Sequence, residues 1–190
     1  LADADNRLEP DCISKLLRYL EASDFAGVAA QKVASASHEY WSRAWEWNNT
    51  NALYTPGPKM VVGHPSLYKT AVLQAVRYNP AILGSADDTD LCFRLARAGF
   101  TVAVGPGVCR EVMRNTFKTF LRKTFWYGKG DAEFFWCYPD RRWSIASHAI
   151  RSYFFKGQVR AFLAGRVDLM PFFALYGIVR WAGFWTGLLQ

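Results

Sequence analysis

The sequence predicts an α/β domain followed by a helical, apolar tail. Short segments of strand type alternate with segments of helical periodicity, which is the pattern of α/β domains. Hydrophobic residues make up 51% of the 190 residues and aromatic residues 16%, a composition that excludes a disordered chain. The last stretch, from Met170 to Leu189, is apolar except for Arg180. We therefore place the α/β domain at residues 1–142 and the tail at 143–190.

The first elements are a helix, a strand and an aromatic helix. Pro10-Asp11 opens the first helix, because apolar residues follow at i, i+3, i+4 and i+7 spacing: Ile13, Leu16, Leu17 and Leu20. Residues 25–33 are small and apolar and predict a strand. Residues 38–51 are rich in aromatic side chains and predict a helix.

The middle of the chain continues the alternation. A break at residues 55–58 precedes a predicted strand at 60–63 and a helix at 66–78. Acidic residues then open a helix that ends at Gly99, and residues 101–104 predict a strand that ends at Gly105-Pro106-Gly107. Two basic helices are expected after it, at 116–127, ending near Gly128 and Gly130, and at 143–164.

Charge and cysteine usage restrict the class of protein. The net charge of +7 suits nucleic acid, an anionic membrane or phosphorylated small molecules. The sequence contains no recognised nucleic-acid-binding motif, so we exclude nucleic acid as a partner. The four cysteines have no CxxC spacing, which disfavours zinc and a disulfide framework. The three histidines show no metal-ligand spacing, and we interpret them as structural or surface residues.

Asp3 and Asp5 flank one small residue, Ala4, where a strand is expected to end. Two carboxylates at this spacing can hold a divalent cation together with the oxygens of a diphosphate. The metal then neutralises the charge that develops on a leaving diphosphate. The alternative is an acidic turn with solvated side chains.

A second acidic cluster, Asp87, Asp88 and Asp90, lies at a predicted helix start after Gly84. A carboxylate held there could act as a general base toward a sugar hydroxyl. The alternative is capping of the helix and compensation of its dipole, which also explains acids in a first turn.

The ordered motifs resemble family 2 glycosyltransferases of the GT-A fold, which are inverting enzymes with nucleotide-sugar donors. Residues 1–11 resemble the family's DADxxLxPD signature, and residues 87–95 resemble its EDxDLxxRL motif. Residues 122–130, with Trp126-Tyr127-Gly128, resemble a segment ending in YGrG that follows in many members. The resemblance covers roughly residues 1–135 and implies a partial GT-A, Rossmann-like domain.

The resemblance also implies roles for individual residues. Asp3 and Asp5 would bind a divalent metal, Mg²⁺ or Mn²⁺, and the donor diphosphate, with Asp5 the more direct ligand. Asp88 matches the catalytic base of an inverting transfer. Further expected contacts are Arg122 to the donor diphosphate and three residues in the acceptor region: Asp87, Trp126 and Tyr127.

Two departures from the family pattern refine this expectation. The usual Glu before the base is Asp87 here, which keeps the charge but shortens the reach. The QxxRW motif of processive polymerising members is not found near residues 120–126, so we expect addition of a single sugar. Because the chain opens at Leu1 just before the first motif, we also expect upstream sequence with the nucleobase contacts.

The tail suggests a membrane. Residues 172–189 are about long enough to cross the hydrocarbon core of a membrane, which takes a helix of roughly 20 residues. The charge of Arg180 in the middle of this segment makes its insertion into the core energetically costly. Basic residues before the tail suit the cytoplasmic side: Arg151, Lys156, Arg160 and Arg166. Either a span or a surface helix pair fits, and the alternative is a buried helix packed on another domain.

The sequence therefore predicts a metal-dependent, inverting glycosyltransferase of hexosyltransferase type. It would transfer one sugar from a nucleotide-sugar donor to a glycan or lipid-linked acceptor in cell-envelope polysaccharide biosynthesis. We expect it at the cytoplasmic face of the plasma (inner) membrane. The alternative is a non-catalytic, membrane-associated docking or scaffold module.

Overall fold

The chain divides into two compact units in the computed structural model, which describes residues 1–3, 5–33, 38–82, 84–111 and 116–190. The first unit comprises residues 1–79 and 88–114, and the second comprises residues 80–87 and 115–190. The elements are mixed strands and helices, so the α/β prediction is confirmed. The predicted domain limit after residue 142 stays a prediction.

The first unit is built on a mixed sheet. Its strands are β1 (Asn6–Leu8), β2 (Gly27–Val33), β3 (Gly57–Lys59), β4 (Ser66–Tyr68) and β5 (Val102–Glu111). β2 and β5 run parallel at the centre, whereas β4 pairs antiparallel with β2. β1 and β3 pair antiparallel with the two ends of β5. Beyond β4, the backbone of Leu1 exchanges two hydrogen bonds of 2.9 Å with that of Ser66, which brings the first acidic motif to this edge.

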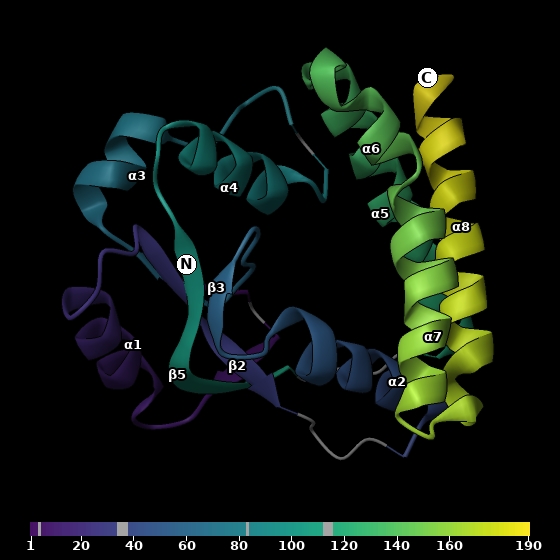
Figure 1. Ribbon diagram of the computed structural model, residues 1–190, viewed down its shortest axis with the longest axis horizontal. Helices are drawn as coiled ribbons and strands as arrows, with labels where there is room; N and C mark the ends of the chain where they lie inside the picture. Colours follow the sequence, from purple (N-terminus) through teal and green to yellow (C-terminus); the bar gives the residue numbers. More distant parts are fainter. Residues whose placement is uncertain (4, 34–37, 83, 112–115) are drawn as a thin grey trace. The chain divides into compact units, whose positions relative to one another are not determined.

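Helices cover both faces of this sheet (Figure 1). The helical elements of this part of the chain are α1 (Cys12–Glu21), α2 (Tyr40–Asn48), the π-helical turn η1 (Asn49–Leu53), α3 (Thr70–Val76) and α4 (Asp87–Arg97). Alternate residues of the strands serve the two faces. Val28 and Ala103 pack with Leu16 of α1, and the neighbouring Ala29 and Val104 pack in a separate core with α4. Burial on both faces explains the nearly continuous apolar run of β2.

Three local predictions for this unit are wrong. Residues 60–63 form no strand, because they lie between β3 and β4 without a strand partner in the described sheet. The helix predicted at 66–78 starts only at Thr70, since Ser66–Tyr68 pairs with β2. β5 also continues through Gly105-Pro106-Gly107 to Glu111. A Cβ at Gly107 would lie 2.6 Å from Leu16 Cγ, so this glycine admits α1 rather than turning the chain.

The second unit consists of helices. They are α5 (Phe117–Cys137), η2 (Pro139–Arg141), α6 (Arg142–Ala146), η3 (Ala149–Phe155), α7 (Lys156–Leu163), η4 (Val167–Leu169) and α8 (Met170–Leu188). The helix predicted at 143–164 is present as three successive helical segments, α6, η3 and α7. The helix predicted at 116–127 does not end near Gly128 but runs on to Cys137.

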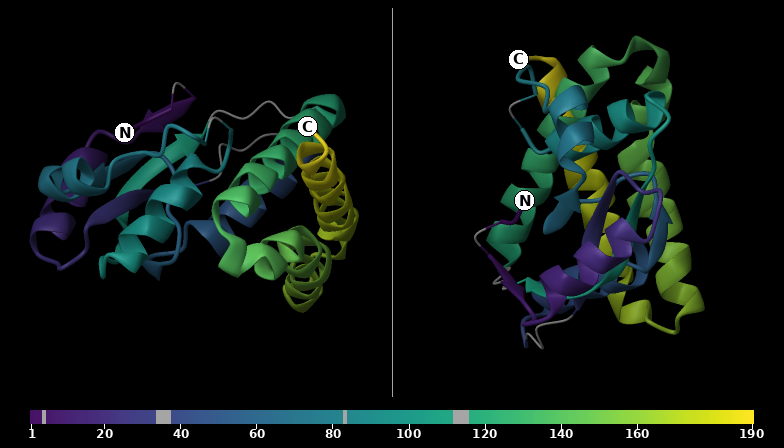
Figure 2. Two further views of the ribbon diagram at one scale, coloured as in Figure 1. Left: turned by 90° about the horizontal axis from the view of Figure 1, so that it is seen from above. Right: turned by 90° about the vertical axis from the view of Figure 1, so that its left-hand side faces the viewer.

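Glycines allow α5 and α8 to pack at close range along each other (Figure 2, green and yellow). A Cβ on Gly128 would collide with the backbone of Arg180, and one on Gly183 would collide with the carbonyl of Phe125. A third glycine of this region, Gly130, lies against the backbone of Ser85 and Ala86. The missing side chains of these glycines therefore allow the backbones of neighbouring segments to come into contact. They do not mark the end of α5.

A mostly buried ion pair lies between α5 and α8, with the side chains of Arg180 and Asp131 only 13% and 15% exposed. The guanidinium of Arg180 donates to both carboxylate oxygens of Asp131 at 2.6 and 2.8 Å. It also donates to the hydroxyls of Tyr153 and Tyr176 at 3.3 and 3.5 Å. The segment Val167–Leu188 is long and apolar enough to cross a membrane, and 39% of its apolar window is buried within the protein.

Candidate active site

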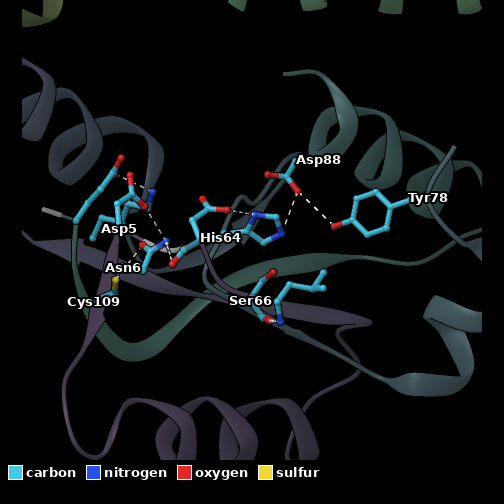
Figure 3. Close-up of polar contacts among 11 residues, drawn as sticks. Asp5, Asn6, His64, Ser66, Tyr78, Asp88 and Cys109 are labelled. Atoms are coloured by element: carbon cyan, nitrogen blue, oxygen red, sulfur yellow. Dashed lines mark hydrogen bonds and ion pairs between the residues drawn. The ribbon is translucent and has the colours of Figure 1, made fainter. Parts of the chain in front are cut away.

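Asp88 lies in the first turn of α4, next to two polar side chains (Figure 3). The hydroxyl of Tyr78 donates to Asp88 Oδ1 at 3.4 Å, and His64 Nε2 lies 3.6 Å from the same oxygen. The positive ends of the backbone dipoles of α4 point toward this carboxylate. The Asp88 side chain is 23% exposed, so it is held in place and still reachable.

His64 connects the two acidic motifs of the first unit. Its Nδ1 lies 3.1 Å from Asp3 Oδ1, while its Nε2 faces Asp88. Within the part of the chain that the structure describes, Nε2 makes no hydrogen bond although it is buried. One imidazole ring therefore lies between the carboxylates that the sequence had assigned to metal binding and to base catalysis.

Gly63 makes this arrangement sterically possible. A Cβ at this position would lie 2.6 Å from the Tyr54 hydroxyl and 3.3 Å from Asp88 Oδ2. Burial raises the pKa of Tyr54, so its hydroxyl stays protonated beside the backbone of Gly63. Any side chain here would displace either Tyr54 or the candidate base.

The other two acidic residues of the second motif, Asp87 and Asp90, have different positions in the structure. Asp90 is fully buried and binds Arg94 at 2.7 Å, so it belongs to the core of α4 rather than to the site. Asp87 opens α4 but lies in the second compact unit. Its predicted place in the acceptor region stays a prediction.

The first motif supplies oxygen donors for a metal, but no complete metal site. Asp5 is exposed and accepts a hydrogen bond of 3.4 Å from Asn6, its neighbour at the start of β1. Ala4 between the two acids lies outside the described residues. Among the described residues, no group of three or more His, Cys, Asp or Glu side chains could hold a metal ion. Two exposed carboxylates fit a hard cation that takes its other ligands from water and phosphate.

Three predicted site residues lie on α5, in the second unit. Arg122 and Trp126 are exposed, and the Tyr127 ring packs 5.4 Å from that of Trp126 and 5.5 Å from the Arg180 guanidinium. Tyr127 therefore contributes to the surroundings of the buried ion pair. The expected contacts of these residues with donor and acceptor stay predictions.

Sequence reasoning also missed a buried ion pair in the first unit, between Lys32 and Glu111. Lys32 binds Glu111 at 2.8 Å near the carboxyl ends of the parallel strands β2 and β5, where ligands bind in many α/β folds. Asn49 donates to the same carboxylate at 3.3 Å, and the Lys32 ammonium lies 4.8 Å from the centre of the Tyr54 ring. The signal that could have found it is a lysine inside a mostly apolar strand.

The comparison with family models decides the class. The model of glycosyl transferase family group 2 matches residues 1–188. The chain belongs to this family. A search of curated proteins gave no match. As a member of glycosyl transferase family group 2, the chain is a transferase domain that acts on a glycosyl donor and an acceptor.

Membership also gives the His64 contacts a chemical setting. In this member of the family, the carboxylate of Asp88 and the acidic motif at Asp3 lie on two sides of the His64 ring. His64 was not among the predicted site residues, because a lone histidine gives no spacing signal. The place to look was the segment between the two acidic motifs, where Gly63-His64 precedes β4.

Proposed function

We propose that this chain carries the metal and acceptor part of an inverting glycosyltransferase that adds a single hexosyl unit to a glycan or lipid-linked acceptor. The observation that supports it best is the placement of His64 between Asp3 and Asp88. With His64 between them, a diphosphate-type acidic motif and a candidate base lie near each other, which supports a site where one group assists the leaving diphosphate and the other the acceptor hydroxyl.

In the proposed reaction, Asp88 accepts the proton of the acceptor hydroxyl. The oxygen then forms a bond to the anomeric carbon of the donor, and the bond from that carbon to the diphosphate breaks on the opposite face. The Tyr78 hydroxyl donates a hydrogen bond to the Asp88 carboxylate and the His64 ring packs beside it, and we propose that both restrict its orientation, which lowers the cost of reaching the reactive geometry.

Asp3 and Asp5 would hold the divalent metal, Mg²⁺ or Mn²⁺. When bound, the metal neutralises the charge of the leaving diphosphate. Their exposure leaves room for the phosphate oxygens and waters that complete such a coordination shell. Arg122 is proposed as an additional diphosphate contact, and Asp87, Trp126 and Tyr127 as parts of the acceptor region.

We also propose that the enzyme works at the cytoplasmic face of the plasma (inner) membrane in cell-envelope polysaccharide synthesis. Basic residues precede the apolar helix α8, as they do on the cytoplasmic side of membrane segments: Arg151, Lys156, Arg160 and Arg166.

The test of the proposed base is Asp88→Asn in the full-length protein. This change keeps the size of the side chain and its position at the helix start, but it removes the proton acceptor. We expect kcat for nucleoside diphosphate release to fall by about a hundredfold or more, with the melting temperature nearly unchanged. Asp24→Asn, an exposed turn residue of the same unit, is the matched control.

Normal turnover of Asp88→Asn would show that Asp88 is not the base. If neither the wild type nor the variant released nucleoside diphosphate with any donor and metal tried, the alternative of a non-catalytic docking module would be favoured.

A further inference from the structure

The outward face of α8 is apolar along its length. Within α8, every residue of which is described, the exposed positions are Pro171, Ile178, Trp181, Ala182 and Trp185. Trp181 and Trp185 lie edge to face, 5.9 Å apart, and their side chains are 41% and 47% exposed. Tryptophan prefers the boundary between lipid and water, so this face is of the membrane-interface type.

Arg180 does not interrupt this face. The guanidinium is held by Asp131 of α5 and by two tyrosine hydroxyls, so its charge is paired on the inner side of the helix. The sequence between Met170 and Leu188 contains no other charged residue. The residue that argued against a membrane contact is therefore turned away from the outward face.

The partner helix decides between crossing a membrane and lying on it. α8 packs along α5, and α5 carries basic and acidic residues over its length: Lys118, Arg122, Lys123, Lys129, Asp131 and Glu133. If α8 crossed a bilayer in this packing, α5 would enter the hydrocarbon with it. Each lysine or arginine at the centre of a bilayer costs about 2.5–3.5 kcal/mol. The packing therefore favours a helix that lies in the plane of the surface.

The neighbouring helix α7 adds to the apolar surface of this unit. It packs on α8, where Gly157 lies against the ring of Phe173. Val159, Phe162 and Leu163 of α7 are 58–79% exposed. Lys156 at the start of α7 is also exposed, and a lysine of this kind reaches the headgroups while its stem covers apolar surface.

The distribution of charge identifies the occupant of this face. Residues 116–190 contain eleven Lys and Arg against four Asp and Glu, a difference of +7 that equals the net charge of the whole chain. A second copy of this unit would carry the same positive net charge, and the repulsion between the two copies disfavours self-association. An anionic lipid surface offers the opposite charge and an apolar boundary in one place.

We propose that α8 lies flat on an anionic membrane, with Trp181 and Trp185 in the headgroup boundary and Arg180 paired inside the protein. This placement deepens the membrane association proposed above and does not depend on the role of Asp88. It makes the second unit an interfacial anchor of the transferase rather than a transmembrane one.

The test uses purified full-length protein and two kinds of sealed vesicle. One is phosphatidylcholine alone, and the other is an equimolar mixture of phosphatidylcholine and phosphatidylglycerol. We expect the wild type to float with the anionic vesicles. The double variant Trp181→Gln, Trp185→Gln should bind these vesicles at least about tenfold more weakly than the wild type. Trp143→Gln, which changes an 83% exposed tryptophan of α6, is the control that should bind like the wild type.

A second measurement separates the flat helix from a span. An alkaline carbonate wash should release the wild-type protein from cell membranes, whereas retention in the pellet would overturn the flat placement. Unchanged vesicle binding of the double tryptophan variant would also overturn the proposal. So would a concentration-dependent dimer that the same variant abolishes, because the face would then bind a second copy.

The variant Asp88→Asn separates failure of this proposal from failure of the proposed function. It should bind anionic vesicles like the wild type even where turnover is lost. An active enzyme that does not bind vesicles would overturn the anchor and leave the transferase assignment standing.

Discussion

His64 Nε2 lies 3.6 Å from Asp88 Oδ1, and the other nitrogen of the ring lies 3.1 Å from Asp3. The ring is 17% exposed and follows Gly63, whose missing side chain leaves space for Tyr54 and Asp88. Neither acidic motif contacts the other through its own side chains in these interactions. One residue that belongs to neither motif therefore lies close to a carboxylate of each.

The first prediction concerns this ring. His64→Ala should lower kcat by about tenfold to a hundredfold, because displacement of a reacting group by about 1 Å can cost that much. Steady-state release of nucleoside diphosphate from the full-length protein measures the effect. His38→Ala is the control, since His38 is exposed and lies outside the site. Equal turnover of both variants would mean that His64 has no part in positioning the carboxylates.

The second prediction concerns the buried ion pair of the second unit. Arg180→Met leaves the Asp131 carboxylate without its bidentate partner among the surrounding tyrosines. Loss of one member of a buried pair costs about 3–5 kcal/mol, and we expect the free energy of unfolding to fall by that order. Urea unfolding followed by tryptophan fluorescence measures it.

An exposed ion pair of the same unit is the matched control. Arg166 binds Asp168 bidentately at 2.8 Å, but both side chains are 40–49% exposed. Arg166→Met should therefore cost less than about 1 kcal/mol. The double variant Arg180→Met, Asp131→Leu should recover most of the lost stability, because it leaves no unpaired charge. Equal losses for Arg180→Met and Arg166→Met would contradict the buried pair.

Local signals in the sequence were sufficient for the long helices and for the two central strands, β2 and β5, but not for the short strands β1, β3 and β4. The acidic start and the glycine stop of α4 were both predicted correctly, since capping depends on neighbours in sequence. The class followed from ordered motifs, and the match over residues 1–188 confirms it. Two of the errors came from glycines. Gly107 and Gly128 predicted ends, but each admits another segment, and such contacts depend on tertiary packing.

The periodicity of apolar residues also predicted a wider buried face for α1 than the structure has. Ile13 and Leu17 belong to the predicted apolar stripe of α1, yet they are 55% and 46% exposed, whereas Cys12 and Leu16 are buried. His64 shows the same limit for the site, because no local pattern indicates that a histidine will lie between carboxylates far away in sequence. Asp88 could be assigned from its motif, but its contacts with Tyr78 and His64 required the fold.

The third prediction tests close packing of α5 and α8. In Gly183→Ala, the added Cβ would collide with the carbonyl of Phe125, a backbone atom that cannot move without shifting α5. Overpacking of this kind costs about 1–3 kcal/mol, and urea unfolding should show a loss in that range. Ala182→Ser is the control at the exposed neighbouring position. If Gly183→Ala were as stable as the wild type, the two helices would not approach as closely as described.

The last prediction concerns acid stability. Burial, with the positive charge of Arg180 as the next cause, lowers the pKa of His148 from 6.5 to about 4. Its ring lies 5.6 Å from that of Tyr153, which itself accepts a hydrogen bond from Arg180. The folded state therefore keeps His148 neutral at a pH where the unfolded chain already binds a proton.

The sign of the effect follows from this difference in bound protons. Between about pH 6.5 and pH 4 the unfolded state holds the extra proton, so acid favours unfolding and stability rises with pH in that window. The slope from this one residue is at most about 1.4 kcal/mol per pH unit. Above that window the residue is neutral in both states and contributes no slope.

The measurement is urea unfolding of wild type and His148→Gln across this range of pH. Other groups also titrate, so the informative quantity is the difference between the two curves. The wild type should lose stability faster than His148→Gln as the pH falls, and the curves should run parallel near neutral pH. His38→Gln, at an exposed position, should follow the wild type throughout. Curves for His148→Gln that stay parallel to the wild type down to pH 5 would mean that His148 accepts its proton as readily in the folded protein as in the unfolded chain.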